Sequence, residues 1–272
     1  MVNHPRINRF IPFIRVIRIA LLALVVVPTG FAEDSRAGTS TPRFDTVVID
    51  AGHGGEDAGA LGASGLVEKD LVLRLAKRLR GELSRRGLKV VMTRVDDTFV
   101  SLEERFAIAN DARGDLFVSI HANASPDTGV YGSEVYFYAS IASDEDAGRL
   151  ASRENAALRA SALDTGGATD PVLAILGDMK RGAYEEESAR FARLAESELA
   201  GMRSSHSRGV KQAPFVVLNG QMPASLVEVG FLTHKGEEKR MRSTSGQDQI
   251  VAALAGAVLE YGRSFDKKWE TR

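Results

Sequence analysis

The chain has 272 residues, of which 44% are hydrophobic and 26% are charged, and its formal net charge is −1 at pH 7. This composition is that of a globular protein, and it excludes a disordered or fibrous chain. Because the sequence contains no cysteine, a disulfide framework, a cysteine-rich metal site and a lipoprotein anchor are all excluded. Any metal ion must therefore be bound through nitrogen and oxygen atoms.

Residues 1–32 have the pattern of an export signal. Four arginines and no acidic residue accompany an unbroken apolar run at 19–27, which is followed by a proline and a small-residue exit at 30–32. A run of this length is too short to span a bilayer as a mature helix, so we predict cleavage and no stable membrane span afterwards. An uncleaved anchor is the alternative, since neighbouring apolar residues extend the run.

Removal of this segment lowers the number of basic residues from 35 to 31, against 36 acidic residues, which gives a formal charge of −5. Nucleic-acid binding depends on neutralisation of phosphates by basic side chains, so we expect no nucleic-acid partner. Export indicates a periplasmic location, with an extracellular or wall-associated location as the second choice.

The remaining chain alternates between apolar strands and amphipathic helices, without internal repeats. Residues 33–43 are polar and are interpreted as a linker, 44–266 as one catalytic domain and 267–272 as a tail. Strands are predicted at 45–50, 88–93, 115–120, 132–138 and 226–232, and helices at 68–86, 101–111, 143–160, 185–203 and 245–262. The stretch 163–184 is interpreted as a loop with one helical turn near 172–179. Such alternation predicts a sheet that helices cover on both faces.

Two histidines each come at the end of a predicted core strand. His53 lies in the sequence DAGHGG directly after the first strand, and His121 follows the apolar run DLFVSI. Open α/β sheets build their sites at the carboxyl ends of strands, so both histidines are candidate metal ligands. A hydrogen-bonded structural histidine is the alternative for each of them taken singly.

Glu68 opens the long predicted helix, where an acidic residue also serves simply to complement the helix dipole. The preceding loop, 54–65, contains five glycines, which allow the chain to fold back tightly. That return would bring Glu68 beside His53. Two imidazoles and one carboxylate with an open position form a common catalytic zinc set.

Glu228 stands inside the otherwise apolar segment LVEVGFL. A buried carboxylate is costly unless it is paired with a cation, so the position indicates either a structural salt bridge or a role near a metal ion. For Arg94 and Arg105 a structural role and a contact with a substrate carboxylate both remain open. The glycine-rich loop matches neither the phosphate-binding nor the dinucleotide-binding pattern, and no H-E-x-x-H motif occurs.

At these residues the chain resembles the zinc-dependent N-acetylmuramoyl-L-alanine amidases of the AmiA, AmiB, AmiC and LytC type, known as the amidase 3 family. The matching segments are VVIDAGHGGEDAGALG, LVEKD, SLEERFAIANDARGDLFVSIHANAS and SLVEVGFLTHKGEE. They occur in the family's order and extend from about residue 46 to the C-terminal helix.

The resemblance implies that His53, Glu68 and His121 bind one Zn²⁺ ion and that Glu228 is the catalytic acid and base. It implies a single α/β domain with a mainly six-stranded, mostly parallel sheet flanked by helices on both faces. The implied substrate is peptidoglycan, cleaved between N-acetylmuramic acid and the L-alanine of the stem peptide, and we expect a monomer.

Some relatives carry a helix that plugs the zinc cleft until an activator protein displaces it. The sequence at 142–187 shows no clear plug, so an activator is an open expectation here. Two alternative functions share the same residues: a zinc peptidase that cuts within the stem peptide or cross-link, and an inactive wall-binding scaffold.

Overall fold

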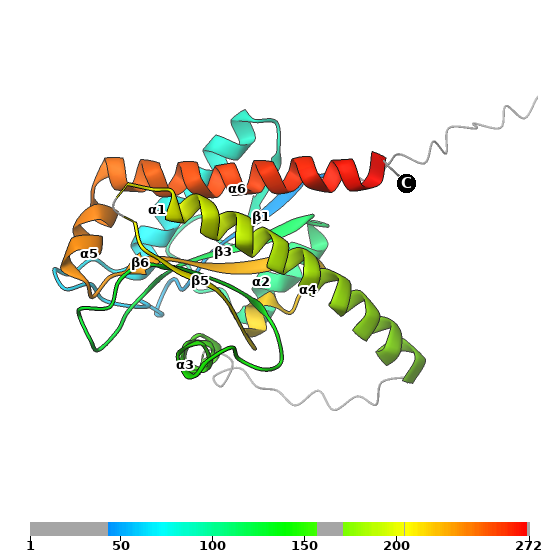
Figure 1. Cartoon of the computed structure of the whole chain (residues 1–272), viewed down its shortest axis with the longest axis horizontal. Helices are drawn as coiled ribbons and strands as arrows, with labels where there is room; N and C mark the ends of the chain where they lie inside the picture. The colour runs from blue at the N-terminus through cyan, green and yellow to red at the C-terminus, as the bar shows by residue number, and fades with distance from the viewer. Residues whose placement is uncertain (1–42, 157–170, 204, 271–272) are drawn as a thin grey trace, which may run out of the picture. The chain divides into compact units, whose positions relative to one another are not determined.

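The computed structural model describes residues 43–156, 171–203 and 205–270 (Figure 1). The predicted signal at 1–32 and nearly all of the predicted linker lie outside these residues. Within the described ranges, no helix combines the length and the apolar character that crossing a membrane requires.

The centre of the fold is one six-stranded sheet with the strand order β2-β1-β3-β6-β4-β5. The strands are β1 (Thr46–Ala51), β2 (Lys89–Met92), β3 (Leu116–Asn123), β4 (Ser133–Tyr138), β5 (Ser207–Ala213) and β6 (Ala224–Phe231). Every neighbouring pair is parallel except β4 and β6, which are antiparallel. The predicted α/β class and the mostly parallel six-stranded sheet are therefore confirmed.

Helices cover both faces of this sheet (Figure 1). The helices are α1 (Glu68–Arg85), α2 (Leu102–Asp111), α3 (Glu145–Glu154), α4 (Pro171–Ala200), α5 (Lys235–Arg242) and α6 (Thr244–Glu270), and a 3₁₀ turn spans Val216–Leu218. The larger core lies between the sheet and helices α1, α4 and α6. The smaller core, on the other face, is closed by α2, α3 and the 3₁₀ turn.

Alternation along the central strands decides which side chains face which core. In β3, Val118 and Ile120 belong to the larger core, whereas Phe117 belongs to the smaller one. Since successive side chains of a strand point to opposite faces, His121 lies on the same face as Phe117. By the same rule Glu228, two residues after Leu226 of the smaller core, lies on that face of β6. Two polar side chains thus share the face that α3 covers.

Several predicted elements are confirmed. α1 ends one residue before its predicted end, and α2 begins with the predicted capping box, in which Ser101 accepts from the backbone N–H of Glu104 and the Glu104 side chain accepts from Ser101 N–H. α6 runs to Glu270, beyond its predicted end and into the predicted tail.

Three elements differ from the prediction. β5, with the sequence SRGVKQA, is an edge strand that pairs only with β4, so it lacks the apolar run that marks a central strand. α5 is short and polar, and its amino end is capped by His234. The loop predicted at 163–184, with one helical turn near 172–179, is wrong from residue 171 onward because α4 begins at Pro171, and proline is favoured in a first helical turn. Residues 157–170 of this region lie outside the described chain.

Candidate active site

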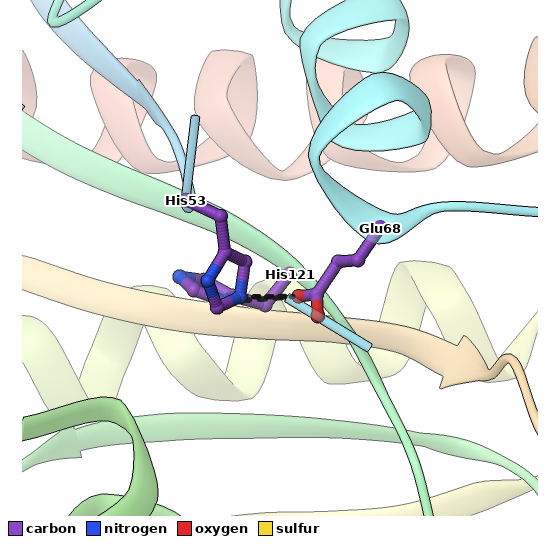
Figure 2. Close-up of side chains that lie close together, drawn as sticks. All are labelled: His53, Glu68 and His121. Atoms are coloured by element: carbon purple, nitrogen blue, oxygen red, sulfur yellow. Dashed lines mark hydrogen bonds and ion pairs between the residues drawn. The ribbon is translucent and has the colours of Figure 1, made fainter. Parts of the chain in front are cut away.

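Three side chains from separate parts of the chain converge at the carboxyl ends of β1 and β3 (Figure 2). His53 follows β1, Glu68 is the first residue of α1, and His121 lies near the end of β3. Glu68 Oε1 is 3.0 Å from His53 Nε2 and 3.1 Å from His121 Nδ1, and the two imidazole centroids are 4.8 Å apart. All three sequence-predicted ligands therefore meet at one point.

The glycine-rich loop between β1 and α1 folds back on itself, as its composition predicts. Short antiparallel bridges join Gly54 to Asp57 and Leu61 to Val67, and Glu68 N–H donates to Ala60 O at 2.9 Å. The return places Gly59 so close to the trio that a side chain there would lie within 2.6 Å of both Glu68 and His53. The loop is therefore folded tightly around the two side chains that it brings together.

Hydrogen bonds orient the converging side chains. His53 Nδ1 lies 2.8 Å from Asp57 Oδ2, and we assign the ring proton to this nitrogen because Asp57 accepts it. Glu68 accepts backbone N–H groups from Ala60 at 2.7 Å and Ala122 at 2.9 Å. His53 Nε2 is buried and has no hydrogen-bond partner. This nitrogen faces the Glu68 carboxylate, whose Oε1 atom lies 3.0 Å away.

Glu228 adjoins this trio from β6, where it lies opposite His121 in the strand register. Its side chain is 1% exposed, and its Oε2 atom is a second buried atom without a hydrogen-bond partner. The candidate ligand atoms of His121, Glu154 and Glu228 all lie within 4.8 Å of one another. Of the two roles that its sequence position indicated, the one near a metal ion fits Glu228, which lies beside the predicted metal ligands. Among the described residues it forms no salt bridge.

Glu154 is a site residue that sequence analysis missed. It ends α3, and its Oε2 atom lies 3.6 Å from His53 Nε2 and 3.5 Å from His121 Nδ1. One glutamate among several charged residues of an amphipathic helix gives no separate sequence signal. Only the packing of α3 over the sheet brings it to the site.

The electrostatics of the cluster reflect four carboxylates around two imidazoles. Burial disfavours the charged form of His53, yet Glu68, Asp57 and Glu154 raise its pKa to about 11. Burial opposes ionisation of Glu68 as well, but the two histidines hold its pKa below the usual range. Burial and the nearby carboxylates of Glu68 and Glu154 raise the pKa of Glu228 well above its usual value.

The cluster suits a divalent metal ion by its donor set and by its unpartnered atoms. Two imidazole nitrogens and a carboxylate are the donors found in catalytic zinc sites. His53 Nε2 and Glu228 Oε2 both lack hydrogen-bond partners, although burial makes an unsatisfied polar atom costly. A cation between these groups would offset the excess of negative charge. His53 and Glu68 line a cleft of about 490 Å³, whose walls also include Phe99, Arg153 and Glu154.

Comparison with known proteins finds relatives over most of the chain. The family model Amidase_3, N-acetylmuramoyl-L-alanine amidase, matches residues 47–260. AmiC of Neisseria meningitidis is 35% identical over 85% of this chain, and the matched region spans 58% of that protein. AmiA of Salmonella typhimurium is 33% identical over 88% of this chain and 83% of its own length.

A solved structure gives the same result for the fold. The crystal structure of N-acetylmuramoyl-L-alanine amidase from Clostridium difficile 630 has a TM-score of 0.62 and 30% sequence identity to this chain. The likeness covers 82% of this chain and 99% of that one. The chain therefore belongs to the Amidase_3 family of N-acetylmuramoyl-L-alanine amidases.

Proposed function

We propose that this protein hydrolyses the amide bond between N-acetylmuramic acid and the L-alanine of the peptidoglycan stem peptide. The observation that carries the proposal is the convergence of His53, Glu68 and His121 with Glu228 beside them. Family membership supports the same activity. Zinc suits two imidazoles and a carboxylate with an open position, and the family resemblance implies it.

In this proposal each residue has a separate role. His53 Nε2, a Glu68 carboxylate oxygen and His121 Nδ1 would hold one Zn²⁺ ion, which would supply a Lewis acid for the amide carbonyl and lower the pKa of water to about 7. Asp57 fixes the orientation of the His53 ring through its 2.8 Å hydrogen bond.

Glu228 is the proposed acid and base. Its unpartnered Oε2 atom accepts a proton from the attacking water and returns a proton to the leaving nitrogen of L-alanine. Burial supports this role because a raised pKa brings a carboxyl group closer to neutral pH, where proton transfer in both directions is efficient. The scaffold alternative gives no reason for a buried, unpaired carboxylate at this position.

The proposed place of action is the cell envelope, with the periplasm as first choice. The arginine-rich start and apolar run at 1–32 support export of the chain to the compartment that holds its polymeric substrate. The formal charge of −5 after loss of this segment gives no support to a nucleic-acid substrate.

A regulatory contact forms part of the proposal. The Glu154 carboxylate lies within 3.6 Å of a nitrogen of each histidine, so it competes with substrate for the space around the metal. α3 would then close the site until a partner or the substrate moves it. The anchoring of Arg153 to the backbone of Ala124 and the side chain of Asn123 supports a closed arrangement of this helix end.

The test is digestion of purified peptidoglycan by the protein, with and without a chelator, followed by mass spectrometry of the products. The proposal predicts free stem peptides that begin with L-alanine and glycan chains without peptides, and it predicts loss of both on chelation. Shortened peptides that remain on the glycan would contradict it and would identify a peptidase instead.

A further inference from the structure

Two buried arginines contact the backbone of residues 51–53, the segment that ends with His53. Arg94 follows β2 and is 4% exposed, and Arg105 belongs to α2 and is 3% exposed. Neither side chain is therefore available to bind a substrate carboxylate as a surface group. Of the two roles that the sequence left open, the structure favours an internal one.

The guanidinium groups hold three successive backbone carbonyls. Arg94 Nε donates to Ala51 O and Arg94 Nη2 to Gly52 O, each at 2.8 Å. Arg105 Nη1 donates to Ala51 O at 2.9 Å, and Arg105 Nη2 donates to His53 O at 2.8 Å. Such planar, multiply bonded contacts exploit the rigid fork of arginine, which lysine cannot reproduce.

Arg94 also joins the two segments that carry different members of the metal trio. Its Nη2 atom, which bonds to Gly52 O, donates to Lys69 O at 2.9 Å as well. Gly52 precedes His53, and Lys69 follows Glu68. One guanidinium nitrogen thus fixes the separation between the neighbours of both residues.

The backbone of His53 explains why this segment must be held. Its φ angle is +59°, a left-handed conformation that a residue with a Cβ atom adopts only at a cost in free energy. A strained residue persists when the surrounding structure fixes it from several sides. The bonds from Arg94 and Arg105 to residues 51–53 supply this restraint.

We propose that Arg94 and Arg105 are positioning residues, which act through the backbone of residues 51–53 to set the geometry of the metal-binding trio. The inference rests on the proposed metal-dependent function. Neither arginine belongs to the proposed ligand set, and both donate to backbone carbonyls of residues 51–53. Their effect is to keep His53 Nε2 directed at Glu68 and His121.

The decisive variant is Arg94→Lys. Lysine keeps the charge but cannot bridge Ala51, Gly52 and Lys69. Arg94 makes no ion pair within 4.0 Å to any described residue, so its replacement leaves no buried carboxylate unpaired. The Zn²⁺ dissociation constant is measured by competition with a chromophoric chelator at a temperature well below unfolding, and it is expected to rise about 10- to 100-fold.

The matched control is Arg240→Lys. Arg240 is also largely buried and also donates to a backbone carbonyl, that of Val229, but it does not contact residues 51–53. Its Zn²⁺ affinity is expected to stay within about twofold of the wild-type value. Thermal unfolding of the metal-free proteins, measured alongside, separates a loss of stability from a loss of metal affinity.

Arg105→Lys provides a second variant, and it is expected to weaken Zn²⁺ binding in the same direction. If this variant does not fold because Asp50 loses its partner, Arg94→Lys decides the question alone. Unchanged Zn²⁺ affinity in folded Arg94→Lys protein would overturn the inference and leave the proposed function standing. A wild-type protein that binds no Zn²⁺ would overturn the proposed function, and this inference with it.

Discussion

At the scale of single residues, the site depends on two glycines as well as on the side chains that they adjoin. A Cβ atom at Gly52 would lie 2.3 Å from the His121 ring, and one at Gly59 would lie 2.6 Å from Glu68 and His53. Both distances are far below van der Waals contact. The glycines of the loop therefore permit the close approach of the three ligating side chains as well as the turn itself.

Gly59→Ala is expected to lower Zn²⁺ affinity by about tenfold or more, because the new methyl group must displace Glu68 or His53. Gly65→Ala is the control in the same loop: it has a similar positive φ of +85°, but nothing lies within 4 Å of the added atom. We expect it to cost about 1 kcal/mol in the free energy of unfolding and to leave Zn²⁺ affinity unchanged. Equal Zn²⁺ affinities in the two variants would show that a methyl group at residue 59 does not displace Glu68 or His53.

Asp57→Asn tests the orientation of His53. An asparagine amide fits the same space but removes the carboxylate that accepts the Nδ1 proton, so Zn²⁺ affinity should fall about 10- to 100-fold. The measurement is chelator competition. Glu56→Gln, a change at the neighbouring residue, serves as the control. A wild-type Zn²⁺ affinity in Asp57→Asn would show that Asp57 does not orient His53 for metal binding.

At the scale of elements, sequence patterns located the ligands because those patterns are local. His53 and His121 follow apolar strands, and Glu68 opens an amphipathic helix, so parallel pairing alone brings them to one edge of the sheet. The approach of Glu154 depends on how α3 packs across that edge, which is a tertiary property with no local pattern. The edge strand β5 escaped prediction for a related reason, since its polar sequence reflects its place at the edge of the sheet, where only its last residue is fully buried.

α3 also carries the prediction for regulation. Glu154→Ala should increase amidase activity because it removes the carboxylate from the ring nitrogens of His53 and His121. If the closed arrangement is ~90% populated, the gain is about tenfold. The control is Glu145→Ala at the opposite end of the same helix, where the side chain is 92% exposed and forms an ion pair with Arg149. A loss of activity in Glu154→Ala would mean that Glu154 takes part in the reaction instead.

At the scale of the whole molecule, a buried ion pair couples the sheet to the smaller helical layer. Asp50 of β1 accepts from Arg105 of α2 at 2.7 Å, from Thr93 directly after β2 and from Ser119 of β3. Burial opposes ionisation of Asp50, yet Arg105 and these hydroxyl groups hold its pKa below the ordinary 3.8. The pair thus stabilises the packing of α2, and with it the placement of the arginine beneath His53.

Because the folded-state pKa of Asp50 is lowered, its contribution to stability is complete above pH 3.8 and is lost as pH falls through the folded-state value. Asp50→Asn should therefore cost about 3 kcal/mol in unfolding free energy at pH 7, and this difference should shrink below pH 3.8. The measurement is urea unfolding of the metal-free wild type and Asp50→Asn at pH 7 and at a pH below 3.8. If the loss of unfolding free energy in Asp50→Asn is the same at both pH values, the charge of Asp50 does not contribute to stability.

The metal ligands and Glu228 have separate proposed roles, which zinc content and amidase rate distinguish when both are measured for wild type, His121→Ala and Glu228→Gln. We expect Glu228→Gln to retain one Zn²⁺ per chain yet to lose about 10²- to 10⁴-fold in kcat, because an acid–base group is removed. We expect His121→Ala to lose both zinc and activity. A Glu228→Gln protein with wild-type activity, or one that loses its zinc, would show that these roles are wrongly assigned.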